Sequence, residues 1–396
     1  IEIANTGEKH IIDGVEMEFV YVLDTEAPVE IMVWLPQLKA FCTAEDMTHN
    51  MHNLQTLRGA KVRNGLLWSK AIDTAIERYG DQVEGSFSTH HWPTWGNERI
   101  VDYWEAQRDM YRYLHDQTLH LANRGLTPDE IAEEMKLPAS LASQFNCRGY
   151  YGTLSHNVKA QYDLYFGWFN GNPAHLNPLP PSELGSKYVE AIGGADKVLE
   201  VAKASYAKGE YRWVATLLDN LVFAEPENKE ARRLLADTYT QLGYQAESGP
   251  WRNFYLTGAR DLFKKDVPYT SQLINDGVLA QMDMGTLLDY CAIQLNGEKA
   301  AGKEAVININ FTDTKEKVML MLNNGVLNHR LDSQDEKADL TLEIEKMDFI
   351  KLFFGRTDLQ TLLKTNKVRT TGNTQAMDVI CSAYEPADPN FKIVLP

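Results

Sequence analysis

The sequence lacks several features that mark special classes of protein. Its apolar runs are all shorter than the roughly 18 to 20 residues that a membrane-spanning helix needs, so we expect no membrane span. The net charge of −16 argues against a general nucleic-acid-binding role, because binding to phosphates requires clustered Lys and Arg. The cysteines form no Cys-x-x-Cys pair, which argues against a thiolate zinc site and against a dense disulfide framework; they are Cys42, Cys147, Cys291 and Cys381.

A chain of 396 residues is too long for a single hydrophobic core, so we expect two or three domains. Local sequence patterns divide it into three regions. In residues 1–99, alternating β-branched and aromatic residues predict strands at 15–23 and 29–36. Apolar residues at three- and four-residue steps predict a helix over 53–80. A short strand within 82–92 completes a β–α–β rhythm, which indicates a layered α/β domain.

Residues 100–265 are predicted to be almost entirely helical. A long amphipathic stretch closes at Gly125, and Thr127 is a favourable N-cap before an acidic first turn. A loop rich in Pro, Asn and Gly over residues 167–185 is followed by helix pairs that resemble tetratricopeptide hairpins. Short helical arrays of this kind usually bind a partner or dimerise.

Residues 269–396 change character again. Helical segments alternate with strands, and an Asn324-Gly325 turn predicts an antiparallel hairpin within a small α+β domain. The apolar residues of this region include Met319, Met321, Phe349, Leu352, Phe353 and Phe354. They fit either an ordinary core, which is the commoner role, or a groove or tunnel for an aliphatic ligand.

Carboxylate, imidazole and guanidinium side chains gather in three segments of the first region. These segments hold Glu26 and Glu30; then Glu45, His49, His52, Arg58 and Arg63; and then His90 and His91 directly after a strand. Carboxylates and imidazoles suit a dication such as zinc, and guanidinium groups suit sulfate or phosphate. A metal-dependent hydrolase acting on an anion is therefore one hypothesis.

Each of these residues also fits a role without chemistry. Glu45 precedes a predicted helix and would favour its N-terminus. His49 and His52 would share one helical face, where histidines mostly pack or lie at the surface. Arg58 and Arg63 would form a solvated polar face. The pair His90 and His91, flanked by Trp92 and Trp95, is the strongest isolated signal for a metal site.

Several long strings make the chain resemble the bacterial alkyl sulfatases of the sodium dodecyl sulfate hydrolase type. They are TEAP (25–28), AEDMTHNMHNLQTLRGAKVR (44–63), HHWPTWGN (90–97), RDMYRYLHDQTLHLANRG (108–125), RGYYGTLSHN (148–157) and GYQAESGPWRNFYLTGARDL (243–262). The resemblance runs almost continuously from Glu26 to Leu262, and the remaining tail resembles the family's sterol-carrier-protein-like domain.

The resemblance implies a three-part architecture. Residues 1–99 would be the C-terminal half of a metallo-β-lactamase-like α/β catalytic domain. Residues 100–265 would be an all-α helical dimerisation domain, so a homodimer is expected. Residues 269–396 would be a sterol-carrier-protein-like domain that binds the alkyl chain, which favours the tunnel over the core interpretation.

The resemblance also implies a site with two zinc ions and an alkyl sulfate substrate. The ligands carried over are Glu26, Glu45 as a carboxylate shared between the metals, and His90. Asn53 to Arg58 correspond to the sulfate-binding stretch, with Arg63 as the principal guanidinium. Metal-activated water would hydrolyse the ester to an alcohol and sulfate. His49 or His52 would orient a ligand or protonate the leaving oxygen, and both alternatives stay open.

Two departures from the family pattern qualify this expectation. Leu23-Asp24 stands where the family usually has Pro-Gly, and no His-x-His-x-Asp-His motif is present. Three ligands do not hold two zinc ions in closed geometry, so we expect a preceding segment that supplies the other ligands. The alternatives are a non-catalytic scaffold that binds lipid or detergent, and a metallo-hydrolase for another anion. Family members act on environmental detergents, so the expected location is periplasmic or secreted.

Overall fold

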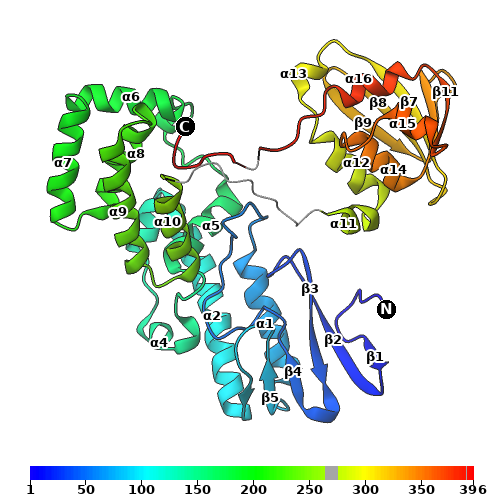
Figure 1. Ribbon diagram of the computed structural model, residues 1–396. Helices are drawn as coiled ribbons and strands as arrows, with labels where there is room; N and C mark the ends of the chain where they lie inside the picture. The colour runs from blue at the N-terminus through cyan, green and yellow to red at the C-terminus, as the bar shows by residue number, and fades with distance from the viewer. Residues whose placement is uncertain (264–274, 389) are drawn as a thin grey trace. The chain divides into compact units, whose positions relative to one another are not determined.

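The computed structural model describes residues 1–263, 275–388 and 390–396, which form two compact units (Figure 1). The first unit comprises the described residues up to 263 together with Lys392–Pro396. The second comprises the described residues from 275 to 391. The region limits predicted at residues 265 and 269 lie outside the described residues. Among the described helices, none is long and apolar enough to cross a membrane.

A six-stranded sheet opens the first unit, with its strands in sequence order. The strands are β1 (Lys9–Ile12), β2 (Val15–Leu23), β3 (Val29–Leu35), β4 (Ala40–Cys42), β5 (Gly85–Phe87) and β6 (Thr94–Trp95). Neighbouring strands are antiparallel except for β4 and β5, which are parallel and are connected through helix α1 (Gly65–Tyr79). The predicted β–α–β unit is therefore present.

Helices cover the sheet and share its core. In Figure 1, α1 lies beside α2 (Asn97–Ala122), and both pack close to the strands. Trp34 of β3 stacks on Tyr79 of α1, and Phe41 of β4 meets Trp104 of α2 edge to face. The same core continues into helix α5 (Leu154–Phe166). It therefore joins the regions that the sequence analysis separates between residues 99 and 100, and that boundary stays a prediction.

The helix predicted over 53–80 is only partly correct, because it begins at Gly65. The side chain of Asn64 caps it by accepting hydrogen bonds from the backbone N–H groups of Leu66 and Leu67. Residues 53–64 instead form a loop whose backbone is bonded to distant side chains, as described below. Tertiary hydrogen bonds thus override a helical pattern of residues, because the loop's polar groups find partners outside it.

The remainder of the first unit is helical, as predicted. The helices are α3 (Pro128–Glu134), α4 (Ala139–Ala142), α5, α6 (Pro181–Ile192), α7 (Ala195–Ala207), α8 (Tyr211–Ala224), α9 (Lys229–Gln245) and α10 (Gly249–Asp261), with short 3-10 turns at Pro36–Leu38, Phe145–Cys147 and Pro173–His175. The predicted cap at Thr127 is confirmed as a capping box with Glu130. Consecutive helices from α6 to α9 bury their apolar faces in a separate core.

The second unit is a mixed α+β fold. Its sheet has the order β11-β10-β7-β8-β9, formed by β7 (Ala305–Phe311), β8 (Lys317–Asn323), β9 (Val326–Leu331), β10 (Leu340–Ile344) and β11 (Val368–Gly372). The predicted Asn324-Gly325 turn joins β8 to β9, with φ of 52° and 74°. The helices are α11 (Asp276–Gln281), α12 (Met284–Ala292), α13 (Gly297–Ala300), α14 (Lys346–Phe353), α15 (Leu359–Lys364) and α16 (Gln375–Cys381).

The sheet also contains one parallel pairing among its described strands, which the predicted hairpin did not imply. β10 pairs in parallel with β7, because the chain crosses back over the sheet after β9 before it forms β10. The returning segment is fixed by Asn308 of β7, whose amide donates to the carbonyl of Asp335 and accepts the N–H of the same residue. A pairing of this kind depends on the connection and is not encoded in strand pattern.

The apolar residues of the second unit mostly supply its core. Phe349, Leu352 and Phe353 of α14 are buried in it, and Phe354 packs against it. Met319 is buried on β8, where the alternation of side chains points it away from the Val318 face that lines this core. Packing therefore accounts for α14, while binding of an alkyl chain by this unit stays a prediction.

Candidate metal and anion site

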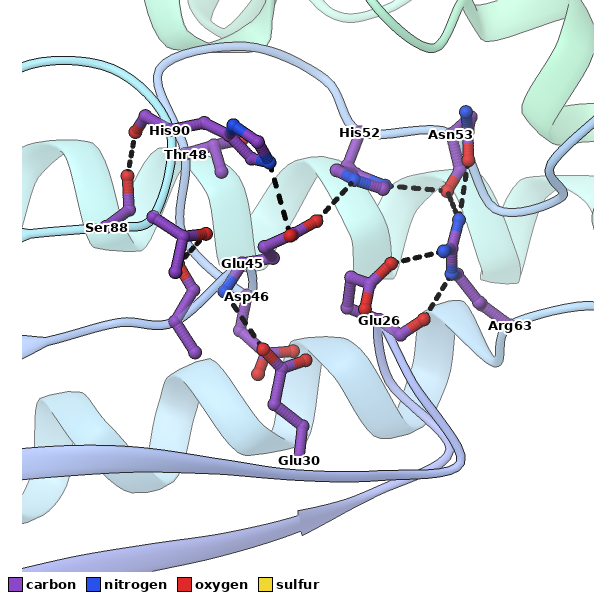
Figure 2. Close-up of polar contacts among 12 residues, drawn as sticks. Glu26, Glu30, Glu45, Asp46, Thr48, His52, Asn53, Arg63, Ser88 and His90 are labelled. Atoms are coloured by element: carbon purple, nitrogen blue, oxygen red, sulfur yellow. Dashed lines mark hydrogen bonds and ion pairs between the residues drawn. The ribbon is translucent and has the colours of Figure 1, made fainter. Parts of the chain in front are cut away.

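Three loops of the first unit bring polar side chains together (Figure 2). The loop between β2 and β3 carries Glu26; residues 43–64 between β4 and α1 carry Glu45, His52, Asn53 and the segment leading to Arg63; and the loop between β5 and β6 carries His90. The strands β2, β4 and β5 point in one direction, because two antiparallel pairings and one parallel pairing separate them. Their carboxyl ends therefore meet at one edge of the sheet.

Glu45 lies at the centre of the site. Its carboxylate oxygens approach two imidazoles, with Oε1 3.2 Å from Nε2 of His90 and Oε2 3.4 Å from Nε2 of His52. Its backbone N–H donates to Oε1 of Glu30 at 3.0 Å. The hydrogen bond from His52, helped by the charges of both imidazoles, lowers the pKa of Glu45 to about 2. This side chain is therefore an ionised acceptor throughout the ordinary pH range.

His52 is buried and fixed on every side. Its Nδ1 lies 2.9 Å from the carbonyl oxygen of Asn53, and its backbone N–H donates to the hydroxyl of Tyr111. Its ring contacts the rings of Trp68 and Tyr151, with centroids 5.4 and 4.8 Å away. Because a carbonyl only accepts, Nδ1 carries a proton, and Nε2 is directed at the carboxylate of Glu45, to which it donates when both ring nitrogens are protonated. In the neutral ring with the proton on Nδ1, Nε2 would instead be free to ligate a metal.

Arg63 joins the first loop to the second. Its Nη1 donates to the backbone carbonyl of Asn53 at 3.0 Å and to the side-chain Oδ1 of the same residue at 2.6 Å. Its Nε and Nη2 donate to the carbonyl oxygen and carboxylate of Glu26. Four of the five guanidinium N–H groups are thereby used, which leaves one donor for an anion, while the guanidinium charge is paired with the carboxylate of Glu26.

The donor set fits a divalent cation. Glu26, Glu45 and His52 each offer a ligand atom, and these atoms lie within 4.8 Å of one another. Asp46 is fully buried, and neither of its carboxylate oxygens has a hydrogen-bond partner among the described residues; the same holds for Oε2 of Glu30. Burial raises the pKa of Glu30 to about 7 and that of Asp46 well above its ordinary value. Four carboxyl groups thus face a single guanidinium, an imbalance that a bound cation would relieve.

Three of the residues singled out in the sequence lie apart from this cluster, namely His49, His91 and Arg58. Nε2 of His49 is 3.0 Å from the hydroxyl of Thr94, and its ring stacks on His91 and meets Trp92 edge to face. Burial lowers the pKa of His49. Arg58 is exposed and lines the rim of the site without a hydrogen bond or ion pair to any described residue.

The expected helical face shared by His49 and His52 is wrong. Residues 43–64 contain no helix, so the two rings are not aligned by helical geometry. Ala44 adopts a left-handed backbone with φ of 49°, and its carbonyl accepts the N–H of Thr89. This strained residue turns the chain at the end of β4 and directs Glu45 into the site, which is where strained backbone concentrates.

Two hollows flank the cluster. One, of about 350 Å³, is lined by imidazoles and aromatic rings and includes His52, His90, His91, Tyr150 and Tyr151. The other, of about 300 Å³, is lined by Arg58, Lys61 and Arg63 together with Asp24 and Glu26, which pair with Lys61 and Arg63; we call it the cationic hollow. The cationic hollow has the chemistry of an anion site, and the first has that of a site for a metal and an apolar group.

Sequence reasoning missed several contributors. It left Glu30 and Asp46 without a role, although Asp46 is fully buried and Oε2 of Glu30 is a buried atom without a hydrogen-bond partner among the described residues. It also missed the side chains of α5 that hold the second loop, among them Asn157. The only sequence signal was indirect, because Asn157 ends the long string RGYYGTLSHN.

Comparisons with known proteins show the family of this chain. Residues 127–265 match the family described as alkyl sulfatase dimerisation, and residues 272–396 match alkyl sulfatase C-terminal. The chain is 45% identical to a linear primary-alkylsulfatase of Pseudomonas sp. over all its residues. A linear primary-alkylsulfatase of Pseudomonas sp. strain ATCC 19151 is 31% identical over 388 residues, and the match covers 72% of that relative. The chain belongs to the alkylsulfatase family.

The likeness to other alkylsulfatases extends to the fold. A stereoselective inverting sec-alkylsulfatase from Pseudomonas sp. superposes with a TM-score of 0.96 at 41% identity, covering 100% of this chain and 62% of that one. The chain spans 59% of the primary-alkylsulfatase that it matches at 45% identity. It thus corresponds to about three fifths of these alkylsulfatases.

The departure at Leu23-Asp24 is accommodated without loss of the loop. Asp24 adopts φ of 52°, a conformation that glycine takes freely and that Asp tolerates. Its N–H donates to the carbonyl of Pro28, and its own carbonyl accepts the N–H of Asn64. The turn that presents Glu26 is therefore formed with Asp in the position of the usual Gly.

Proposed function

We propose that this chain supplies part of the active site, the dimerisation region and the C-terminal unit of an enzyme that hydrolyses alkyl sulfate esters to an alcohol and sulfate. The observation that carries the proposal is the convergence of Glu26, Glu45 and His52, with His90 and Arg63 beside them, in a chain of the alkylsulfatase family.

Zinc is the metal that this donor set suits best, because it accepts both carboxylate oxygen and imidazole nitrogen. We propose that Glu26, Glu45 and His90 are ligands, that Glu45 is shared between two ions, and that His52 lies against the same carboxylate. When bound, zinc would lower the pKa of a coordinated water and so supply a nucleophile at neutral pH. The unpartnered carboxylate oxygens, both of Asp46 and Oε2 of Glu30, support a cation at this place.

The cationic hollow would hold the sulfate group. Arg63 is the best-ordered donor, since Asn53 and Glu26 fix its guanidinium plane and leave one N–H group for the anion. Arg58 and Lys61 add positive charge at the rim. These residues would orient the ester and neutralise the charge of the departing sulfate.

The geometry favours His52 over His49 for the second imidazole role. His52 touches the carboxylate of Glu45, whereas His49 contacts Thr94 and the rings of His91 and Trp92. We propose that His52 orients Glu45 and that His49 shapes the imidazole-lined hollow. Homodimerisation, an alkyl-binding role for the second unit and a location outside the cytoplasm complete the proposal.

The test is sulfate release from decyl sulfate and from a secondary alkyl sulfate by the purified chain joined to a preceding segment that carries a His-x-His-x-Asp-His motif, with and without added zinc and after treatment with a chelator. The 396 residues alone are expected to bind zinc weakly and to release no sulfate. A β-lactam and a phosphodiester serve as competing substrate classes. We expect zinc-dependent release from alkyl sulfates only, and a loss of at least tenfold in kcat/KM for Arg63→Lys, since Lys cannot reproduce the planar donor set. Detergent binding without zinc-dependent hydrolysis, even with the segment that carries the His motif restored, would support the scaffold alternative instead.

A further inference from the structure

The segment from His52 to Gly65 carries His52, Asn53 and Arg63 but contains no helix or strand before its last residue. We call residues 52–65 the anion loop. Backbone N–H and C=O groups that are buried in such a loop need partners from elsewhere. Within these described residues, one backbone-to-backbone hydrogen bond closes the loop on itself, from the N–H of Arg63 to the carbonyl of Leu54 at 2.8 Å.

Asn157 of α5 holds the start of the anion loop. This side chain is fully buried, and its Nδ2 donates to the carbonyl of His52 at 2.9 Å. Its Oδ1 accepts the N–H of Leu54 at 2.8 Å. The two bonds bracket Asn53 as a paired strand would, so the amide side chain fixes the peptide planes on both sides of that residue.

Gln161 holds the end of the anion loop in the same way. It lies four residues after Asn157, on the same face of α5. Its Nε2 donates to the carbonyl of Arg63 at 2.9 Å, and its Oε1 accepts the N–H of Gly65 at 3.0 Å. These bonds bracket Asn64, the N-cap of α1, and so fix the point from which the Arg63 side chain departs.

His156 connects the anion loop to α10. The indole N–H of Trp251 donates to Nδ1 of His156 at 3.2 Å, and Nε2 of His156 lies 2.7 Å from the carbonyl of Gln55. Because an indole only donates, Nδ1 accepts and Nε2 carries the proton that bonds to Gln55. Burial lowers the pKa of His156, which agrees with a neutral ring.

We propose that Asn157, Gln161 and His156 are positioning residues for the site. All of them lie within residues 127–265, the region that matches the dimerisation family. This region then has a second role within its own chain: it holds His52 and Arg63 in place through the backbone of the anion loop. The inference rests on the proposed function, since it concerns the same anion and metal site.

The experiment compares Gln161→Met with Asn97→Leu in the full chain. Both changes remove hydrogen bonds from a side-chain amide to backbone carbonyls and change the side-chain volume little. Asn97 is the matched control, because its Nδ2 donates to the carbonyls of Gly80 and Val83 at the end of α1. The measurements are the dissociation constant for decyl sulfate by calorimetry below its micelle concentration, the Tm, and hydrogen exchange of the Arg63 amide.

We expect Gln161→Met to weaken decyl sulfate binding about tenfold and to accelerate exchange at Arg63, whose amide is bonded to Leu54 and not to Gln161. Asn97→Leu should lower the Tm with neither effect. A loss of Tm in Gln161→Met with binding and Arg63 exchange unchanged would overturn the proposal. If Gln161→Met does not fold, Trp251→Phe gives the same test through His156, with the same two readouts.

The proposed function fails separately from this inference. Wild-type protein that does not bind decyl sulfate would count against the alkyl sulfate proposal. The exchange rate of the Arg63 amide needs no ligand and would then decide the positioning role by itself. Unchanged exchange in Gln161→Met would overturn that role in this case too.

Discussion

Nε2 of His52 lies 3.4 Å from Oε2 of Glu45, although both residues come from a loop without regular structure. The contact depends on two separate supports. The carboxyl group of Glu30 accepts the backbone N–H of Glu45, and Asn157 accepts and donates on the far side of His52. Loss of either support would separate the carboxylate from the imidazole.

Glu45→Gln tests the central role of this carboxylate. The change removes a charge that two imidazoles face and leaves the side-chain volume almost unchanged, so we expect zinc to bind at least about tenfold more weakly. The measurement is competition for zinc against a chromogenic chelator. Glu84→Gln is the control, because Glu84 is exposed and pairs only with Lys39. Equal zinc affinity in Glu45→Gln and wild type would contradict a role for Glu45 as a ligand.

Gly152→Ala tests the close packing behind His52. A Cβ atom at residue 152 would lie 2.5 Å from the carbonyl oxygen of His52 and 2.8 Å from the backbone nitrogen of Asn53. Neither backbone atom yields easily, so we expect a loss of about 1–3 kcal/mol in the free energy of unfolding and weaker zinc binding.

The control for this prediction is Gly249→Ala. The nearest atom to its added Cβ would be 3.7 Å away, an ordinary contact distance. Urea unfolding and zinc titration of both variants give the comparison. Wild-type behaviour of Gly152→Ala in both measurements would show that the anion loop shifts freely at His52.

Asp24 provides a test of backbone strain beside Glu26. Its φ of 52° lies in the left-handed region, which Gly adopts freely. Ala is disfavoured there, because it has a Cβ atom but no polar side chain to form a local hydrogen bond. We expect Asp24→Ala to be less stable than Asp24→Gly by about 1 kcal/mol. The exposed pair with Lys61 is lost in both variants, so it cancels in the comparison. Urea midpoints that rank Ala above Gly would contradict the strained turn.

Asp219 of α8, which is far from the anion loop in sequence, should make the stability of the folded chain depend on pH. It lines an apolar hollow of about 510 Å³ with residues such as Leu184 and Phe223, and its carboxylate has no hydrogen bond or ion pair to any described residue. Burial raises its pKa above the ordinary 3.8. The folded chain therefore holds this proton at pH values where the unfolded chain has lost it, and stability falls as the pH rises past 3.8.

Asp219→Asn removes this effect. We expect the variant to have a Tm roughly 2 °C above that of wild type at pH 7, with the difference shrinking as the pH falls toward 3.8. Asp237→Asn, at an exposed position on α9, is the control and should change the Tm at neither pH. Thermal unfolding at pH 7 and pH 4 provides the measurement. A gain that grows on acidification would contradict the assigned direction.

Much of the local structure follows from pattern alone. The strand predicted at 15–23 coincides with β2, and the capping box at Thr127 and the turn at Asn324-Gly325 form as their residue types predict. These features depend on neighbours within a few residues, so a single sequence encodes them. The helical prediction over 53–64 failed because the loop's backbone is bonded to Asn157, about a hundred residues away.

The sequence by itself determined which chemical groups this protein has and, through long family strings, which family it belongs to. It identified Glu26, Glu45 and His90 as candidate metal ligands and Arg63 as the candidate anion-binding residue. It gave no reason to assign different roles to His52 and His49. Only the tertiary structure decided that His52 faces Glu45, that Glu30 accepts the N–H of Glu45, that Asp46 is buried and that α5 holds the anion loop. Those relationships come from strand direction and long-range hydrogen bonds, which no local pattern of residues specifies.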